Sequence, residues 1–315
     1  MPSSGLLGCL EVSWEPEDKY KVEDLYMYFT GVMLAERLDP RGFMLSLNET
    51  GIRREGLPSW CPDFHQKPVA TTLADYLGYH ACLTSTDART LHFDPEKRTL
   101  SAKAIVIDQV AELVPGSWLS MLATPIPSVN ITANLLFIRA CAAATQELDA
   151  GDHLWEALLG GQTARETHKG FGDMRLLGHG RHYDRIESRR FSKESSSLEA
   201  AYHALLPALS EAEARVSQDT IAFSPQLTAY IRRIERICLN RKFVTTTSGK
   251  FGLVPLATQP RDSAVVIRNV NVPFILRNTQ SDRDTYTLVG ESYIHGSMRG
   301  ECLKNKPSFR KMTLV

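Results

Sequence analysis

The sequence predicts an α+β protein in which a small antiparallel β-barrel is built from two separate segments of the chain. Short β-branched runs bounded by turn residues recur between residues 241 and 301, as consecutive strands do. Alternating apolar residues over positions 91–113 predict a β-hairpin. Closure into a barrel removes unpaired strand edges, so we expect both segments to form one barrel. This prediction requires residues 100–110 to lie beside residues 265–276.

The 315 residues then divide into three parts. Residues 1–88 form an N-terminal helix and proline-rich loop segment. Residues 89–114 and 241–303 form the barrel. Residues 115–240 are patterned as helices and form an insertion, with a glycine-, serine- and charge-rich flexible loop over residues 160–197.

A helix is expected over residues 21–37, at the start of the N-terminal part. Its apolar residues recur at helical spacing and form one stripe, made of Val22, Leu25, Tyr26, Phe29 and Met33. Pro40 disfavours helical geometry in the residue before it, so the helix should end near position 39. The apolar residues 42–47 fit either a short helix or a strand.

Residues 56–68 contain three prolines and a glycine and should form an irregular loop. Trp60 and Phe64 should anchor it, and the Asp63 carboxylate should accept hydrogen bonds from nearby backbone amides. Cys61, Asp63 and His65 could instead bind a metal ion. They lack a distant partner pair at ligand spacing, so we favour the structural role.

The insertion and the C-terminal segment are expected to contain most of the regular structure. Helices are predicted over residues 133–148, 151–159, 198–209 and 226–240. In the last helix, Tyr230, Ile234 and Ile237 form the apolar stripe. Strands are predicted over residues 242–247, 251–256, 264–270, 272–277, 285–291 and 292–295. Pro273 should lie at a sheet edge or at a strand start.

Composition excludes several classes of protein. The net charge is zero, so there is no overall electrostatic attraction to nucleic acid or to anionic membranes. Six scattered cysteines without a CxxC pair argue against a disulfide scaffold and a structural zinc site, and favour reduced, mostly buried thiols. The N-terminus has no basic region of a secretory signal, and no apolar run is long enough to span a membrane. We therefore expect a cytoplasmic protein.

Several short motifs occur in a characteristic order along the chain. They are GLLG (residues 5–8), KVEDLYMYFTGVML followed by GLPSWCPDF, and then FVTTTSGKFGLVP, PRDSAVVI, VPFILR and YTLVGESYIHGSMRGE. In this order they resemble the fungal heterokaryon-incompatibility proteins. GLLG resembles the end of that family's N-terminal incompatibility domain, the next two motifs resemble the segment after it, and the last four resemble the family's C-terminal end. The motif residues, to which we assign structural roles, are Trp60, Pro62, Asp63, Phe243, Gly252, Pro255, Asp262, Pro273, Gly290, Glu291, Tyr293, His295, Gly296, Gly300 and Glu301.

The resemblance implies a part in fungal non-self recognition and programmed cell death. In the family, the N-terminal incompatibility domain is the effector, and its fold has been compared with NAD-cleaving TIR domains. The sequence starts at the end of that domain. The chain therefore looks like the C-terminal region alone, from a truncated gene or from a divergent or mis-started gene model. No catalytic residue of the family maps onto this chain. We expect a non-enzymatic regulatory or interaction region without a cofactor, whose partner is another protein or the missing effector domain.

Two other classes of function remain as alternatives. Glu291 and His295 could be the acid–base pair of an uncharacterised enzyme, although four residues of strand would separate them by about 13 Å. The loop from Arg175 to Arg190 combines basic and aromatic residues and could bind nucleic acid, although acidic residues dilute its charge. The glycines around Lys250 fit a hairpin turn better than a phosphate loop, because no Ser or Thr follows the lysine.

Overall fold

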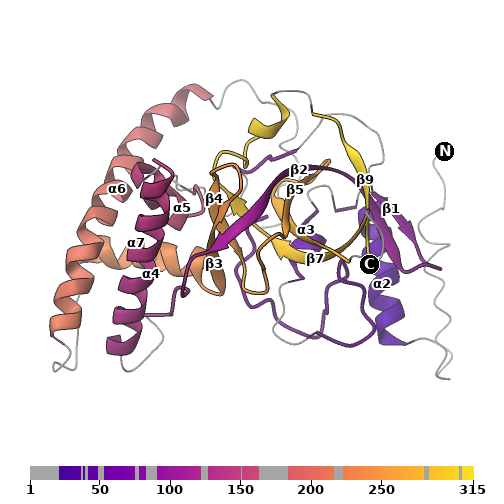
Figure 1. Cartoon of the computed structure of the whole chain (residues 1–315), viewed down its shortest axis with the longest axis horizontal. Coiled ribbons are helices and arrows are strands. Elements are labelled where there is room, and N and C mark those ends of the chain that lie inside the picture. The colour runs from indigo at the N-terminus through magenta and orange to yellow at the C-terminus, as the bar shows by residue number, and fades with distance from the viewer. Residues whose placement is uncertain are drawn as a thin grey trace.

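The computed structural model describes residues 21–36, 38–39, 42–48, 53–74, 78–82, 91–121, 127–149, 151–162, 184–215, 223–279, 284–304 and 307–315. Of residues 127–129 and 184–196 it describes the secondary structure alone. In Figure 1 the strands lie at the centre, with one group of helices on one side of them and the first described helix beside a hairpin on the other.

The described residues contain nine strands in one sheet. The strands are β1 (Leu91–Asp94), β2 (Thr99–Leu113), β3 (Arg241–Thr246), β4 (Phe251–Pro255), β5 (Ser263–Ile267), β6 (Pro273–Asn278), β7 (Thr285–Glu291), β8 (Tyr293–Ile294) and β9 (Arg310–Leu314). The predicted hairpin at residues 91–113 and the six predicted C-terminal strands are confirmed, with small shifts at their ends. Pro273 lies at the start of β6, as expected from its missing N–H.

The pairings from β2 to β5, β6, β7, β9 and back to β2 form a closed ring. Ala104 of β2 lies opposite Ile267 of β5, and Leu100 lies opposite Leu314 of β9. The two distant segments of the sequence therefore do lie side by side, as the prediction required.

Two features of the ring differ from the prediction. Strand β9 lies beyond residue 303, where no strand was expected. Its five residues, RKMTL, include two apolar side chains, too few to give a clear alternation. It pairs in parallel with β7, through Thr285 and Thr313, so the sheet is not purely antiparallel. The ring needs this strand because it is the link between β7 and β2.

Strand β2 is the longest strand and pairs with β1, β3, β5 and β9. Its register shifts between Val106 and Asp108 against β5, and between Val110 and Glu112 against β3. Such bulges bend and twist a strand. They allow β2 to leave the ring and to continue into the branch formed by β3, β4 and β8.

The helices of the middle of the chain are α4 (Pro127–Glu147), α5 (Leu154–Leu158), α6 (Asp184–Ala214) and α7 (Pro225–Cys238), with a 3₁₀ turn η1 (Gly151–His153) before α5. They gather on one side of the sheet (Figure 1). The predicted stripe of α7 is confirmed, since Tyr230, Ile234 and Ile237 are all buried.

The expected flexible loop over residues 160–197 is wrong for its last part, because α6 begins at Asp184. Once a packed stretch has nucleated a helix, each added residue costs little, so weak periodicity does not stop its extension. Residues 163–183 of that loop lie outside the described part of the chain.

Helix α2 (Val22–Ala35) is confirmed, but its predicted apolar stripe is not the face that packs on the sheet. The residues buried against the sheet side are Met27, Thr30, Gly31 and Leu34. Three stripe residues are instead exposed: Val22 by 43%, Leu25 by 53% and Phe29 by 45%. Gly31 explains the choice, because a Cβ there would lie 2.5 Å from the ring of Phe93 in β1. Only glycine permits this close approach.

Residues 42–47, ambiguous in sequence, form the short helix α3 (Phe43–Ser46). Its first amides are bound by one carboxylate, since Asp39 accepts hydrogen bonds from the N–H groups of Phe43 and Met44 at 2.9 and 2.6 Å. This satisfies donors that have no partner inside a helix.

One continuous core joins the helices to the strands. It includes Trp155 and Leu158 of α5 together with Phe251 and Leu253 of β4. Among the described cysteines, Cys61, Cys82, Cys141 and Cys238 are buried free thiols. Burial raises the pKa of Cys61 and of Cys82 to about 11, which keeps both protonated and unreactive. None of the described helices has the length and apolar content needed to cross a membrane.

Candidate functional site

The most unusual surface of the described chain is the exposed apolar side of α2. We define the α2 face as Val22, Leu25, Tyr28 and Phe29, which are 43 to 53% exposed. Phe64, exposed by 39%, extends this face, because its ring packs edge-on against Phe29 at 5.8 Å between centroids. Contiguous exposed apolar side chains on a soluble fold commonly mark a binding surface.

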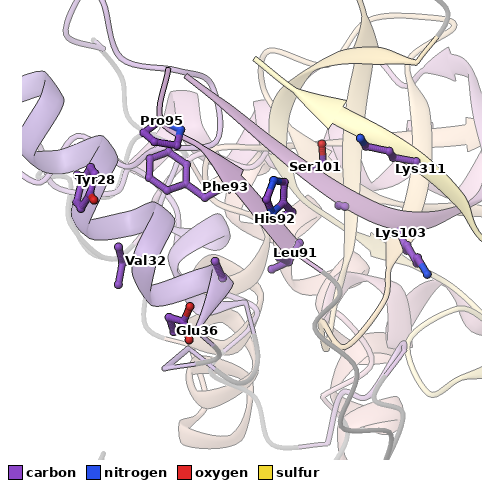
Figure 2. Close-up of a pocket in the computed structure, with 12 residues that line it drawn as sticks. Tyr28, Val32, Glu36, Leu91, His92, Phe93, Pro95, Ser101, Lys103 and Lys311 are labelled. Atoms are coloured by element: carbon purple, nitrogen blue, oxygen red, sulfur yellow. The ribbon is translucent and has the colours of Figure 1, made fainter. Parts of the chain in front are cut away.

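A groove of about 570 Å³ lies beside the α2 face, between α2 and the β1–β2 hairpin. Its lining includes the apolar residues Val32, Leu91 and Phe93 and the charged residues Glu36, Lys103 and Lys311. Figure 2 shows Tyr28 and Val32 on the helix, and Phe93 and His92 on the neighbouring strand. A lining that combines apolar and charged side chains suits a protein segment better than a small polar metabolite.

The proline-rich loop of residues 56–68 packs against the hairpin that lines this groove. Trp60 is fully buried, its ring lies 5.5 Å from that of Phe93, and its indole N–H donates to the Arg98 carbonyl at 3.3 Å. Arg98 in turn pairs with Asp24 in the first turn of α2. The loop thus fixes the angle between α2 and the hairpin.

Asp63 binds backbone amides as predicted, accepting from His65 N and from Arg54 N at 3.1 Å each. Pro62 is buried beside it. The metal alternative for this loop is not formed: Cys61 is buried and contacts Thr30, whereas His65 is exposed. Phe64 is a weaker anchor than expected, because it lies against α2 and stays partly in solvent.

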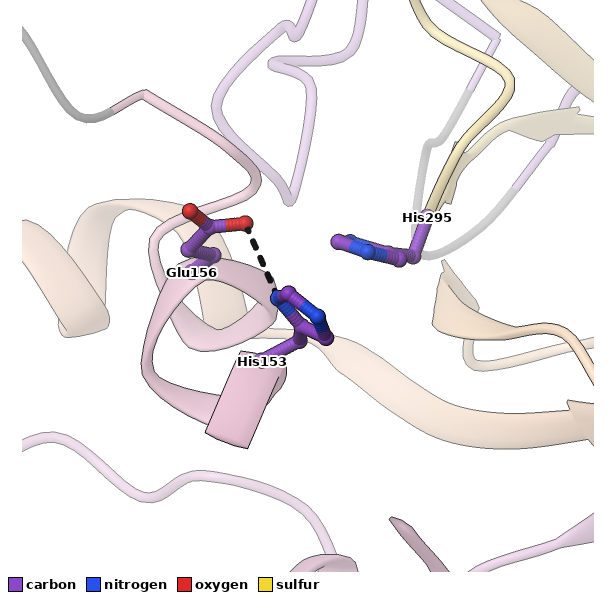
Figure 3. Close-up of side chains that lie close together, drawn as sticks. All are labelled: His153, Glu156 and His295. Carbon is purple, nitrogen blue, oxygen red and sulfur yellow. Dashed lines mark ion pairs between the residues drawn. The ribbon is translucent and has the colours of Figure 1, made fainter. Parts of the chain in front are cut away.

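A second site lies where α5 meets the end of β8. Within the described part of the chain, His153, Glu156 and His295 are the one group of three metal-ligating side chains whose ligand atoms all lie within 4.8 Å of one another. His153 and Glu156 stand three residues apart at the start of α5, with His153 Nδ1 3.8 Å from Glu156 Oε2. Figure 3 shows the three side chains pointing toward a common space.

His295 is held firmly in this cluster. Its ring stacks on Phe251 with 4.8 Å between centroids, and its Nδ1 lies 3.1 Å from the Tyr293 hydroxyl. Burial lowers the pKa of His295, and the neighbouring His153 acts in the same direction. The imidazole is therefore neutral at neutral pH and able to accept a proton or to bind a cation.

Glu291 does not share a site with His295. It is completely buried and pairs with the equally buried Arg241, with 2.8 Å between Oε1 and Nη2. The amides of Leu73 and Ala74 also donate to its carboxylate. Burial raises the pKa of Glu291, and the Arg241 guanidinium opposes that rise. Because the two groups face different partners, the acid–base pair of the alternative enzyme hypothesis is not assembled.

The remaining motif residues lie in strands and turns. Phe243 is buried in β3, and Pro255 ends β4 opposite Arg241. Gly252 permits a close crossing, since a Cβ there would lie 1.9 Å from the Tyr293 carbonyl oxygen. Asp262 pairs with Arg277 at 2.8 Å. The others mark the bulge between β6 and β7 and the turns after β8: Gly290, Gly296, Gly300 and Glu301.

Sequence reasoning did not single out His153, Glu156, Arg241 or Asp108. The i, i+3 spacing of His153 and Glu156 was the available signal, but their partner is far away in the sequence. Asp108 was detectable as an isolated carboxylate within the apolar run of β2. Of the proposed nucleic-acid loop, residues 175–183 lie outside the described chain and residues 184–190 belong to α6.

The comparisons with known proteins agree with the resemblance seen in the sequence motifs. Residues 183–312, which are less than half of the chain, match the family model of the Het-6 beta-barrel domain. This match is consistent with the C-terminal region of a heterokaryon-incompatibility-type protein. The match runs from α6 to β9 and leaves β1 and β2 in front of it. No curated protein and no solved structure matches the chain.

Proposed function

We propose that the chain is a non-enzymatic regulatory region of a heterokaryon-incompatibility-type protein, and that its α2 face binds an incompatibility domain. The observation that carries this proposal is the exposed α2 face, on a helix whose other side is packed against the sheet. Through such contact the chain would control an effector of fungal non-self recognition and cell death.

The position of α2 supports this choice of partner. Residues 5–8 resemble the end of the incompatibility domain, and α2 is the first described helix after them in the sequence. The α2 face is equally open to a domain carried by another chain. Burial of the α2 face would remove from water the apolar side chains that the fold leaves exposed.

The closed ring of strands supports the structural part of the proposal. We assign β2, β5, β6, β7 and β9 as the barrel of the matched family, with β2 supplied from outside the matched residues. In this view the barrel is a rigid platform, and the α2 face and groove are its recognition surface. We assign Glu291 to the core of the platform, because it pairs there with the buried Arg241.

The test is binding of a purified incompatibility domain, taken from a complete member of the family. Wild-type chain is compared with the double variant Leu25→Asp/Phe29→Asp, and with Leu136→Asp as a matched control. Leu136 is exposed by 59% on α4, so it tests the effect of the same change at a distant surface.

We expect the double variant to bind at least ~100-fold more weakly. Each half-exposed side chain contributes about 1 kcal/mol on burial, and an unpaired carboxylate placed in an apolar interface costs more. Leu136→Asp should bind as the wild type does. Equal binding by all three proteins would reject the α2 face. Cell death or NAD cleavage by the isolated chain in a fungal host would reject the non-enzymatic role.

A further inference from the structure

We infer that His153, Glu156 and His295 form a binding site for one zinc ion. Two imidazoles and a carboxylate are a donor set that zinc takes in proteins. The three side chains converge from two parts of the fold that are far apart in the sequence, so their meeting is a product of the tertiary structure (Figure 3). The inference stands independently of the proposed function.

The geometry requires a small adjustment that the side chains can make. Ligand atoms around a tetrahedral zinc ion lie about 3.4 Å apart, given bonds of about 2.0–2.1 Å. The present separations are all within 4.8 Å, and His153 Nδ1 lies 3.8 Å from Glu156 Oε2. These two side chains are 55% and 32% exposed, so both can rotate toward the ion without disturbing the core.

His295 is the fixed member of the site. When its Nδ1–H donates to the Tyr293 hydroxyl, the proton sits on Nδ1 and leaves Nε2 free as the ligand. Stacking on Phe251 holds the ring in place. This arrangement of a ligating imidazole with a second hydrogen-bonded nitrogen is the usual support of a zinc ligand.

The charges around the site partly oppose each other. Glu301 favours positive charge near His295, whereas Lys250 disfavours it. Glu156 supplies the negative charge inside the cluster itself. With three protein ligands, one coordination position is left for water. The ion would connect the start of α5 to the turn after β8, and so join the helices to the strands.

The test uses the full chain, freed of metal by a chelator and carrying no affinity tag of histidines. Zinc chloride is titrated by calorimetry, and cobalt(II) replaces it for absorption spectroscopy. The main variant is His153→Ala, because its side chain is the most exposed of the three and its loss should leave the fold intact. The matched control is His65→Ala, an exposed histidine of the proline-rich loop.

We expect one zinc ion per chain, the spectrum of tetrahedral cobalt, and a higher unfolding temperature with zinc present. His153→Ala should bind ~100-fold more weakly or worse, since even the loss of a supporting group costs about 10- to 100-fold. His65→Ala should match the wild type. The inference is overturned by an absence of zinc binding, by unchanged binding in His153→Ala, or by a sulfur-to-cobalt charge-transfer band, which would locate the ion on cysteines.

Discussion

At the scale of single residues, Asp108 shows how a charge is accommodated in a strand. It lies at the bulge of β2 and accepts hydrogen bonds from the hydroxyls of Thr246 and Thr247 at 2.6 Å each, and from that of Ser248. Burial alone raises its pKa, but the hydrogen bonds from Ser248, Thr246 and Thr247 outweigh this and leave the pKa below the ordinary value of 3.8. The carboxylate thereby joins β2 to the β3–β4 turn.

This pKa shift predicts an effect of pH on stability. The pKa of Asp108 is lower in the folded state than its ordinary value of 3.8. Its contribution to the free energy of unfolding is therefore fully present above pH 3.8, and it is lost as the pH falls through the pKa of the folded state. Asp108→Asn should lower the free energy of unfolding at neutral pH by about 1–3 kcal/mol. The NH₂ group that replaces one carboxylate oxygen cannot accept from the Ser248 amide and hydroxyl, while the other oxygen still accepts. In this variant the free energy of unfolding should also fall less steeply as the pH is lowered into the acidic range.

Denaturant titrations between neutral and acidic pH measure both effects of Asp108→Asn. Asp152→Asn is the control, since Asp152 is exposed in η1. If the free energy of unfolding falls as steeply at acidic pH in Asp108→Asn as in the wild type, other groups cause the loss of stability.

Residues such as Asp63 and Pro273 were predictable because their roles are local. An aspartate binds amides a few residues away, and a proline at a strand start has no N–H to donate. Asp108, Arg241 and His295 were not, because each is completed by residues more than 40 positions away in the sequence. The three proposed zinc ligands in particular come together because the start of α5 lies against the end of β8.

At the scale of elements, the sequence placed most helices and strands but not the direction in which α2 faces. That helix has two apolar sides. The side that contains Gly31 packs against the sheet, because Gly31 leaves room for the ring of Phe93, although the apolar stripe on the other side is more regular in sequence. Strand β9 was missed because a short strand with two basic residues at its start has little apolar alternation. Its pairing with both β2 and β7 gives it structure.

The closing role of β9 predicts a large effect from one of its side chains. Met312 is fully buried in the core, whereas Val315 is 37% exposed just beyond the strand. Met312→Ala should lower the free energy of unfolding by about 2–5 kcal/mol, and Val315→Ala by no more than about 0.5 kcal/mol. Urea denaturation measures both. Similar small losses would mean that β9 is not part of the stable ring.

At the scale of the whole molecule, helices and strands were predicted as separate parts, an insertion and a barrel. The structure shows that α5 and β4 contribute to one core, through Trp155, Leu158, Phe251 and Leu253. The sequence could indicate which segments are helical, but it could not show that their apolar faces would merge.

The shared core predicts a single cooperative unfolding transition. Differential scanning calorimetry should give a calorimetric enthalpy equal to the van't Hoff enthalpy, because the helices cannot leave without exposing the strands. Circular dichroism and tryptophan fluorescence should report the same midpoint. Two resolved transitions, with helix lost before strand, would contradict this and favour an independently folded insertion.

The connections of β2 also affect how the protein is made. When β2 leaves the ribosome it has only the short β1 to pair with, because its next partner begins at Arg241 and its last ends at Leu314. At common rates of translation, the intervening synthesis takes on the order of 10 s. During that interval most backbone N–H and C=O groups of this strand of 15 residues have no partner strand. We therefore expect chaperones to bind the nascent chain until β9 has been synthesised.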